Sequence, residues 1–309
     1  MNNEEETKCR PKELDKTIVE YNKGKRTITC FCGEKVSYSI VPHLKKCHTE
    51  KWRDWKATFV VLKNKGYSWK DIMRLFRAGD GKLLFSWTVI ETSVKEEIES
   101  GREKYVPVMQ REVKRWEPSN FEIEKTTVWN FPKRGDWATH SGNYRGNWPP
   151  QIPRNLIMRY TQEEDVIVDA FAGGGTTLIE AWLLKRKSIG LDISKLAIQT
   201  MQAKLNEMEK LASEDRRIQL DMNCRPKVIN ADALELSAVL AQNGVNSAKL
   251  VCAHPPYLDS IKYTINNKSD LALAREPDIF YSKIRDFCRE VKKILAIDGV
   301  CAILIGDTR

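Results

Sequence analysis

Two stretches of this 309-residue chain contain residue types that bind ligands or carry out chemistry, and the more N-terminal one is rich in soft metal ligands. It holds Cys30, Cys32, His43, Cys47 and His48 within nineteen residues. Thiolate sulfur and imidazole nitrogen are the ligands that tetrahedral zinc prefers. The segment therefore predicts a structural zinc site made by Cys30, Cys32, His43 and either Cys47 or His48. We favour Cys47, which lies one helical turn beyond His43. A small domain without metal is the alternative, because a single residue separates the first two cysteines.

The second stretch is a glycine loop between a predicted strand and a predicted helix. It reads Asp169-Ala170-Phe171-Ala172-Gly173-Gly174-Gly175-Thr176-Thr177. Glycines at such a turn let a cofactor lie against the backbone. No lysine follows them, which disfavours a nucleoside triphosphate. Asp192 and Asp232 end the next two predicted strands, where a carboxylate can accept hydrogen bonds from a ribose. The pattern predicts a nucleoside-bearing cofactor. A tight turn with ordinary solvated strand ends is the alternative.

A proline pair follows the fourth predicted strand of the same region, in His254-Pro255-Pro256-Tyr257. Consecutive prolines fix an extended turn. This turn places Tyr257 at the sheet edge, next to the expected cofactor.

The elements that must position these residues follow from the hydrophobic pattern. Alternating strands and helices from residue 127 onward predict a parallel sheet with helices on both faces. Upstream, three apolar stripes at helical spacing within residues 52–98, joined by short glycine-containing turns, resemble a helix-turn-helix bundle. We therefore divide the chain into a loose arm (1–26), a zinc finger (27–50), a helical module (51–101), a polar linker (102–126) and the α/β domain (127–309).

Composition and charge restrict the class of protein. Hydrophobic residues make up 41% and charged residues 30%, as in ordinary globular domains. No run of about eighteen apolar residues predicts a membrane span, and the acidic N-terminus is unlike a signal peptide, so we expect a cytoplasmic protein. Residues 1–120 carry 25 Lys and Arg against 18 Asp and Glu, a net +7, whereas residues 121–309 carry 26 against 24. The N-terminal excess favours a polyanionic partner, although a solvated basic face would look the same.

Taken in order, the motifs of the α/β domain resemble those of S-adenosylmethionine-dependent DNA amino-methyltransferases, which modify the exocyclic amine of adenine or cytosine. The Phe-x-Gly-x-Gly loop of that family matches Phe171, Gly173 and Gly175, and its Asp/Asn/Ser-Pro-Pro-Tyr/Phe segment matches residues 254–257. Its segment at the methionine end of the cofactor is similar to residues 148–157, with residues 128–131 upstream. The loop and this resemblance together give the expected cofactor-binding residues: Asp169, Phe171, Gly173, Gly175, Thr176, Asp192, Asp232, Pro150 and Asn155. The expected catalytic residues are His254, Pro255, Pro256 and Tyr257.

The resemblance implies a mechanism for these four residues. The His254 side chain and the Pro255 carbonyl would accept the two N–H groups of the target amine and aim its lone pair at the methyl group. Tyr257 would stack on the base, which has to be flipped out of the duplex. His254 stands where the family has Asp, Asn or Ser. This departure leaves the choice between adenine and cytosine open, with a degenerate, inactive site as the alternative.

The resemblance also sets expectations for fold and partners. It implies a Rossmann-like class I methyltransferase sheet of seven strands, of which the pattern shows five. A strand at 128–131 could supply one more; otherwise the chain is a fragment or one half of a split enzyme, with a missing C-terminal half. Residues 41–48 are similar to Ros/MucR-type zinc fingers, so we expect double-stranded DNA as substrate, with a cognate restriction enzyme as a further partner. An RNA base methyltransferase and a DNA-binding regulator with a vestigial methyltransferase fold are the rivals.

Overall fold

The computed structural model describes residues 10–22, 24–105, 113–142, 144, 146–256, 264, 269–274 and 276–305. The chain folds into two compact units, residues 1–108 and 109–309. Among the described residues, no helix combines the length and apolar character needed to cross a lipid bilayer.

The first unit begins with a short 3₁₀ helix, η1 (Lys12–Lys16), and a small antiparallel sheet. Its strands β1 (Ile18–Asn22), β2 (Lys25–Thr29) and β3 (Lys35–Ser37) lie in the order β1-β2-β3. Val19 pairs with Ile28 across β1 and β2, and both side chains are fully buried. The prediction of a loose arm over residues 1–26 is therefore wrong for residues 10–22, because these two apolar residues complete a core.

Four helices complete the first unit: α2 (Val41–Cys47), α3 (Thr49–Asn64), α4 (Trp69–Leu75) and α5 (Trp87–Glu99). The last three correspond to the three predicted stripes. Ser68 caps α4 through a reciprocal pair of hydrogen bonds with Asp71, and Ser86 caps α5. The apolar faces meet in an aromatic core formed by Trp52, Trp55, Phe59, Phe76 and Phe85.

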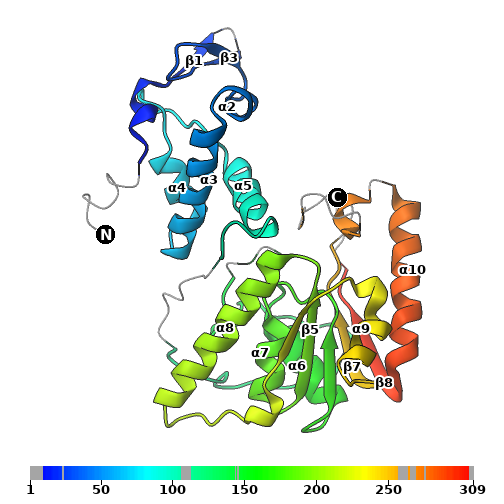
Figure 1. The fold of residues 1–309 in the computed structure, drawn as a ribbon. Helices are drawn as coiled ribbons and strands as arrows, with labels where there is room; N and C mark the ends of the chain where they lie inside the picture. The colour runs from blue at the N-terminus through cyan, green and yellow to red at the C-terminus, as the bar shows by residue number, and fades with distance from the viewer. Residues whose placement is uncertain are drawn as a thin grey trace. The chain divides into compact units, whose positions relative to one another are not determined.

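The second unit is built on a five-stranded sheet in the order β6-β5-β4-β7-β8, with every pair parallel. The strands are β4 (Val166–Asp169), β5 (Lys187–Asp192), β6 (Lys227–Asn230), β7 (Ala248–Ala253) and β8 (Leu295–Ile303). This arrangement confirms the predicted Rossmann-like α/β fold (Figure 1). The strand order reverses between β4 and β7, which is where ligands bind in such sheets.

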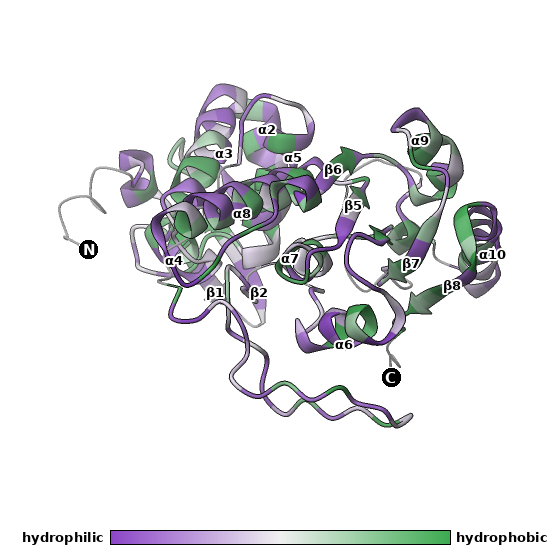
Figure 2. Cartoon of the chain, turned by 90° about the horizontal axis from the view of Figure 1, so that it is seen from below, coloured by the Kyte–Doolittle hydropathy of each residue, from purple (hydrophilic) through white to green (hydrophobic). Residues whose placement is uncertain are grey.

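Helices cover both faces of this sheet (Figure 2). One face packs against α6 (Gln151–Tyr160), α7 (Thr176–Leu183) and α8 (Lys195–Glu214), and the other against α9 (Leu236–Gln242) and α10 (Pro277–Ile294). Successive side chains of β4 point to opposite faces of the sheet and pack in different cores: Ile167 packs toward α6, and Val168 packs toward α9 and α10. The short helices η2 (Met222–Cys224), η3 (Ala233–Glu235) and η4 (Leu271–Leu273) lie in the connections.

Two predictions about the segment before this sheet differ from the structure. Residues 128–131 form no strand, and Val128 is exposed while the Trp129 indole donates to the Thr126 carbonyl. The described sheet thus gains no sixth strand from this segment. Residues 113–126, expected to be part of a polar linker, belong to the second unit, because Trp116 is buried in its core and donates to Asp215 at 2.8 Å.

Candidate functional site

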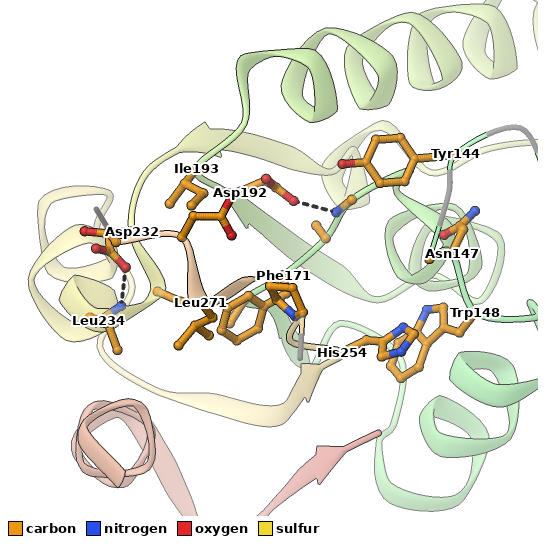
Figure 3. A pocket seen from close by; sticks show the side chains of 18 residues that line it. Tyr144, Asn147, Trp148, Phe171, Asp192, Ile193, Asp232, Leu234, His254 and Leu271 are labelled. Atoms are coloured by element: carbon orange, nitrogen blue, oxygen red, sulfur yellow. Dashed lines mark hydrogen bonds between the residues drawn. The ribbon is translucent and has the colours of Figure 1, made fainter. Parts of the chain in front are cut away.

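A pocket opens at the carboxyl ends of the parallel strands of the second unit (Figure 3). It encloses about 690 Å³ of empty space, its open mouth included. Its lining comes from the segment before α6, the glycine loop, and the residues that follow β5, β6 and β7. The lining residues are Tyr144, Gly146, Asn147, Trp148, Ala170, Phe171, Ala172, Gly173, Asp192, Ile193, Asp232, Ala233, Leu234, His254, Pro256, Ser269, Asp270 and Leu271.

The glycine loop forms the floor of the pocket and is shaped by Asp169, the last residue of β4. The Asp169 carboxylate accepts the backbone N–H of Phe171 at 3.1 Å and the hydroxyl of Thr177. Burial raises the pKa of Asp169 to about 6, against the effect of these hydrogen bonds. Gly173 and Gly175 have φ of 50° and 78°, a region that glycine adopts without strain. Phe171 and Gly173 line the pocket, whereas Asp169 shapes it from behind.

Asp192 faces the pocket from the end of β5, as predicted for the acceptor of a ribose. Its two carboxylate oxygens accept the backbone N–H groups of Gly173 and Ser194, each at 2.9 Å. Burial raises the pKa of Asp192 to about 7, and the nearby carboxylates Asp169 and Asp270 act in the same direction. A carboxylate held in this way can accept further hydrogen bonds from a ligand inside the pocket.

Two further carboxylates line the pocket. Asp232, predicted from the sequence, accepts the N–H of Leu234 at 2.9 Å at the start of η3. Asp270 was not predicted, because it lies outside every motif; it is fully buried and accepts the backbone N–H of Thr264 at 2.8 Å. The side of the pocket formed by the residues after β5 and β6 is therefore acidic, which fits a ligand that offers hydroxyl groups or positive charge.

Tyr144, Gly146, Asn147 and Trp148 supply a wall of the pocket, and of these four the sequence analysis named only Trp148. A Cβ placed on Gly174 would lie 2.9 Å from the Tyr144 Cβ and 3.1 Å from Asn147 Nδ2, so these side chains press against the loop. The Thr176 hydroxyl donates to Asn147 Oδ1 at 2.6 Å, and buried Lys204 donates to the Gly174 carbonyl at 2.7 Å. Thr176 thus holds the wall rather than lining the pocket. In the sequence, the signal for this wall was the segment Trp148-Pro149-Pro150.

Pro150 and Asn155 are not among the lining residues of the pocket. Pro150 precedes the first residue of α6. Asn155 is fully buried and bonds to the backbone of Glu124, accepting its N–H at 2.8 Å and donating to its carbonyl at 3.3 Å. The Asn155 side-chain amide thus anchors the segment 113–126 within the second unit.

The proline pair brings His254 and Pro256 into the pocket lining, with Pro255 buried between them. Tyr257 lies outside the described residues. The His254 ring stacks on the Trp148 indole, with centroids 5.9 Å apart and planes at 21° (Figure 3). Burial lowers the pKa of His254, and a hydrogen bond to the backbone of Gly146 opposes that shift. The imidazole is thereby kept neutral near pH 7, with a nitrogen able to accept a hydrogen bond.

A buried polar network fixes residues on both sides of this wall in the sequence. Glu180 on α7 is fully buried and binds Trp137 Nε1 at 2.6 Å, His140 Nε2 at 2.5 Å and an Arg154 guanidinium nitrogen at 2.9 Å. His140, for which the sequence suggested no role, is one of its donors. A buried carboxylate is stable only when its oxygens are satisfied in this way.

In the first unit, four of the five predicted metal ligands converge. The Sγ and imidazole nitrogen atoms of Cys30, Cys32, His43 and His48 lie within 4.8 Å of one another. Cys32 Sγ is 3.4 Å from His43 Nε2, and tetrahedral zinc would hold such a pair about 3.5 Å apart. His48 Nε2 is buried without a hydrogen-bond partner among the described residues, and a metal ion would satisfy it.

Cys47, favoured from the sequence as the fourth ligand, is exposed and groups with His43 and Glu34, whereas His48, the alternative, groups with Cys30, Cys32 and His43. Helix α2 ends at Cys47, and His48 leaves the helical conformation at φ −136° and ψ 47°. This turn carries the His48 ring to within 5.1 Å of the His43 ring. Glu34 lies 3.4 Å from His43 Nδ1, where a carboxylate commonly orients a metal-binding histidine.

Charge on the first unit is distributed unevenly over its helices. Helix α5 carries Glu91, Glu96, Glu97 and Glu99 against one lysine, and is therefore a poor candidate to enter a DNA groove. The basic residues Lys45, Lys46, Lys51 and Arg53 are exposed at the end of α2 and the start of α3, beside the Cys/His cluster. Two of these lysines are ion-paired within the unit, Lys45 with Glu96 and Lys51 with Glu13, whereas no ion pair of Lys46 or Arg53 is found among the described residues.

Comparison with known proteins gives a family and several partial relatives. A family model described as DNA methylase matches residues 1–203. The chain is 33% identical over 73 residues to type II methyltransferase M2.MboI of Moraxella bovis, covering 24% of this chain and 27% of that protein. It is 36% identical over 91 residues to type II methyltransferase M.MjaI of Methanocaldococcus jannaschii, covering 29% and 28% respectively. The chain thus aligns with little more than a quarter of the length of either relative.

A solved structure gives a weaker match: a SAM-dependent methyltransferase from Agrobacterium tumefaciens with a TM-score of 0.35, 13% identity, and coverage of 52% of this chain and 46% of that one.

Proposed function

Because the chain belongs to the DNA methylase family, we propose that it transfers a methyl group from S-adenosylmethionine to the exocyclic amine of an adenine or cytosine in DNA. The observation that carries the proposal is one pocket, lined by the glycine loop, by Asp192 and Asp232, and by His254 of the proline pair. Cofactor-binding and amine-binding residue types therefore surround a single cavity at the switch point of the sheet.

The residues of the pocket fit the cofactor. Asp192 would accept hydrogen bonds from the ribose, in addition to those from the backbone N–H groups of Gly173 and Ser194. Asp232 would bind the adenosine portion beside Ala233 and Leu234, which also line the pocket. Phe171 and Gly173 would contact the ligand from the floor. S-adenosylmethionine supplies an electrophilic methyl group on a positively charged sulfur, which suits an acidic pocket.

His254 and the proline pair would prepare the target amine. An amine on a base ring is a weak nucleophile because its lone pair is delocalised. The neutral imidazole of His254 and the carbonyl of Pro255 would accept its two N–H groups and direct the lone pair to the methyl carbon. Tyr257 would stack on the flipped base.

The first unit would supply affinity for DNA through a zinc-stabilised fold. Cys30, Cys32, His43 and His48 would hold the ion, and the orphaned His48 nitrogen supports this set. The exposed lysines and Arg53 around the cluster would contact phosphates. Because the aligned relatives are type II methyltransferases, we propose that methylation is site-specific and of the restriction-modification type.

The test is transfer of labelled methyl from S-adenosylmethionine to unmethylated genomic DNA, with single-stranded DNA and RNA in parallel. Digestion to nucleosides and mass analysis should show N6-methyladenine or N4-methylcytosine in the DNA sample. Variant His254→Ala should bind S-adenosylhomocysteine normally and transfer little. Methylation confined to RNA, or none in any sample although cofactor binds, would refute the proposal.

A further inference from the structure

Two cations are bonded to the backbone of the segments that form one end of the pocket. Lys204 of α8 is 3% exposed, and its ammonium donates to the Gly174 carbonyl of the glycine loop at 2.7 Å. The Arg134 guanidinium donates to the Asn147 carbonyl of the wall at 2.9 Å. Arg134 Nε is buried without a hydrogen-bond partner among the described residues. The loop and the wall are therefore each in contact with a positive charge.

The Lys204 ammonium lies beside two residues of the pocket lining. A Cβ placed on Gly174 would lie 3.1 Å from Lys204 Nζ, 3.1 Å from Asn147 Nδ2 and 2.9 Å from the Tyr144 Cβ. The three side chains therefore meet at one point of the glycine loop. Tyr144 and Asn147 line the pocket, so the buried ammonium adjoins the pocket wall.

Among the residues that the structure describes, no carboxylate pairs with either cation. Burial and the charge of Arg134 lower the pKa of Lys204 to about 8, and burial lowers the pKa of Arg134. Glu180, the buried carboxylate of this region, is bound by His140 and Arg154 instead. A buried cation without a counter-ion is costly, so an anion at this end of the pocket would be bound favourably.

The two ends of the pocket differ in charge. Asp192 and Asp232 follow β5 and β6 and make their side of the pocket acidic. Figure 3 shows Asp232 on the side of the pocket opposite Tyr144 and Asn147. A ligand with hydroxyl groups at one end and an anionic group at the other would be oriented by this arrangement of charge.

We propose that the end of the pocket between the wall and the glycine loop binds the carboxylate of the amino-acid portion of S-adenosylmethionine, with Lys204 and Arg134 supplying the counter-charge. This inference rests on the proposed function. The carboxylate is the anionic group of that cofactor, and its ribose hydroxyls suit the acidic end. Lys204 and Arg134 are positioning residues, because they act from behind the lining through the loop and the wall to which they are bonded.

A purely mechanical role for Lys204 is the alternative, in which its ammonium only fastens the glycine loop through the Gly174 carbonyl. The two roles make different demands on the ligand. A fastened loop would favour every adenosine ligand alike. A counter-charge favours only a ligand that carries the carboxylate.

The test is calorimetric titration with S-adenosylhomocysteine and with its decarboxylated form, which keeps the adenosine, the sulfur and the amino group. At pH 7 Lys204, whose pKa is about 8, is mostly protonated. Wild type should bind S-adenosylhomocysteine about tenfold more tightly than the decarboxylated form, as expected for a weak bond to a charged group. Lys204→Met, which removes the charge and keeps an unbranched chain, should lose most of this preference.

Controls separate charge from packing. Lys204→Arg keeps the charge and should retain most of the preference. Lys210→Met removes an exposed lysine of the same helix and should leave the preference unchanged. Arg134→Met is a second test of the counter-charge and should lower the preference too, so the inference stays testable if Lys204→Met does not fold.

The two proposals fail in different ways. Equal binding of the two ligands by wild type, or an unchanged preference in the folded Lys204→Met or Arg134→Met variants, overturns the counter-charge role and leaves the methyltransferase assignment intact. Wild-type protein that binds neither ligand overturns the proposed function itself.

Discussion

Asp192 makes the affinity for the cofactor depend on pH in a range where an ordinary aspartate would not. Burial raises its pKa to about 7, and a ribose hydroxyl can donate effectively only to the carboxylate form. With this pKa, about nine-tenths of the protein carries the carboxylate at pH 8 and about one-tenth at pH 6. S-adenosylhomocysteine should therefore bind about tenfold more weakly at pH 6 than at pH 8.

The assay is calorimetric titration of S-adenosylhomocysteine between pH 5.5 and 8.5, for wild type and Asp192→Asn. The ligand's own ionisations act equally on both proteins and cancel in the ratio of the two affinities. That ratio should fall toward low pH with a midpoint near 7. A ratio independent of pH from 6 to 8 would refute the reasoning that the buried carboxylate binds the ribose in its ionised form.

Stability gives a second readout of the same residue. The folded-state pKa lies above the unfolded value of 3.8, so the stability associated with the protonated form is present below pH 4 and is lost as pH rises through 7. The rise from 3.8 to about 7 corresponds to at most ~4 kcal/mol, because Asp192 lines an open pocket where solvent would screen its charge. Between pH 4 and pH 7, the free energy of unfolding of the wild type, measured with urea, should fall relative to that of Asp192→Asn. An unchanged difference would contradict the raised pKa.

Three further predictions concern the buried network and the first unit. Glu180→Ala leaves a buried guanidinium and two other buried donors without an acceptor, so it should lower the free energy of unfolding by about 3–5 kcal/mol. A loss below about 1 kcal/mol in urea unfolding would contradict this. Purified protein should contain about one zinc ion, which His48→Ala should lose and Cys47→Ser should keep; the reverse pattern in metal analysis would restore Cys47 as the ligand. Lys46→Ala and Arg53→Ala should each weaken DNA binding and lower the slope of log affinity against log salt by about 0.9, and unchanged slopes would exclude them from the contact surface.

Much of the α/β fold follows from local patterns in the sequence. Short apolar runs, helical stripes and glycine turns alternate along residues 166–303, and they place Asp192, Asp232 and His254 after successive strands. Carboxyl ends of parallel strands meet at one edge, so the pattern indicates where these residues gather.

The wall formed by residues 144–148 could not be found in this way. It has no regular secondary structure in its described residues, and therefore no hydrophobic period to read. Its flanks are fixed by Glu180, which binds Trp137 and His140 before the wall and Arg154 after it. Only the folded chain brings such partners together.

The candidate metal ligands of the first unit divide in the same way between what sequence and what tertiary structure determines. Sequence by itself determined that cysteines and histidines cluster, and that Cys30, Cys32 and His43 belong together. Spacing along a regular helix selected Cys47, but α2 ends there and the backbone turns at His48. Only the tertiary structure brings His48, rather than Cys47, to Cys30, Cys32 and His43, because a side chain's direction at a helix end depends on where the helix stops.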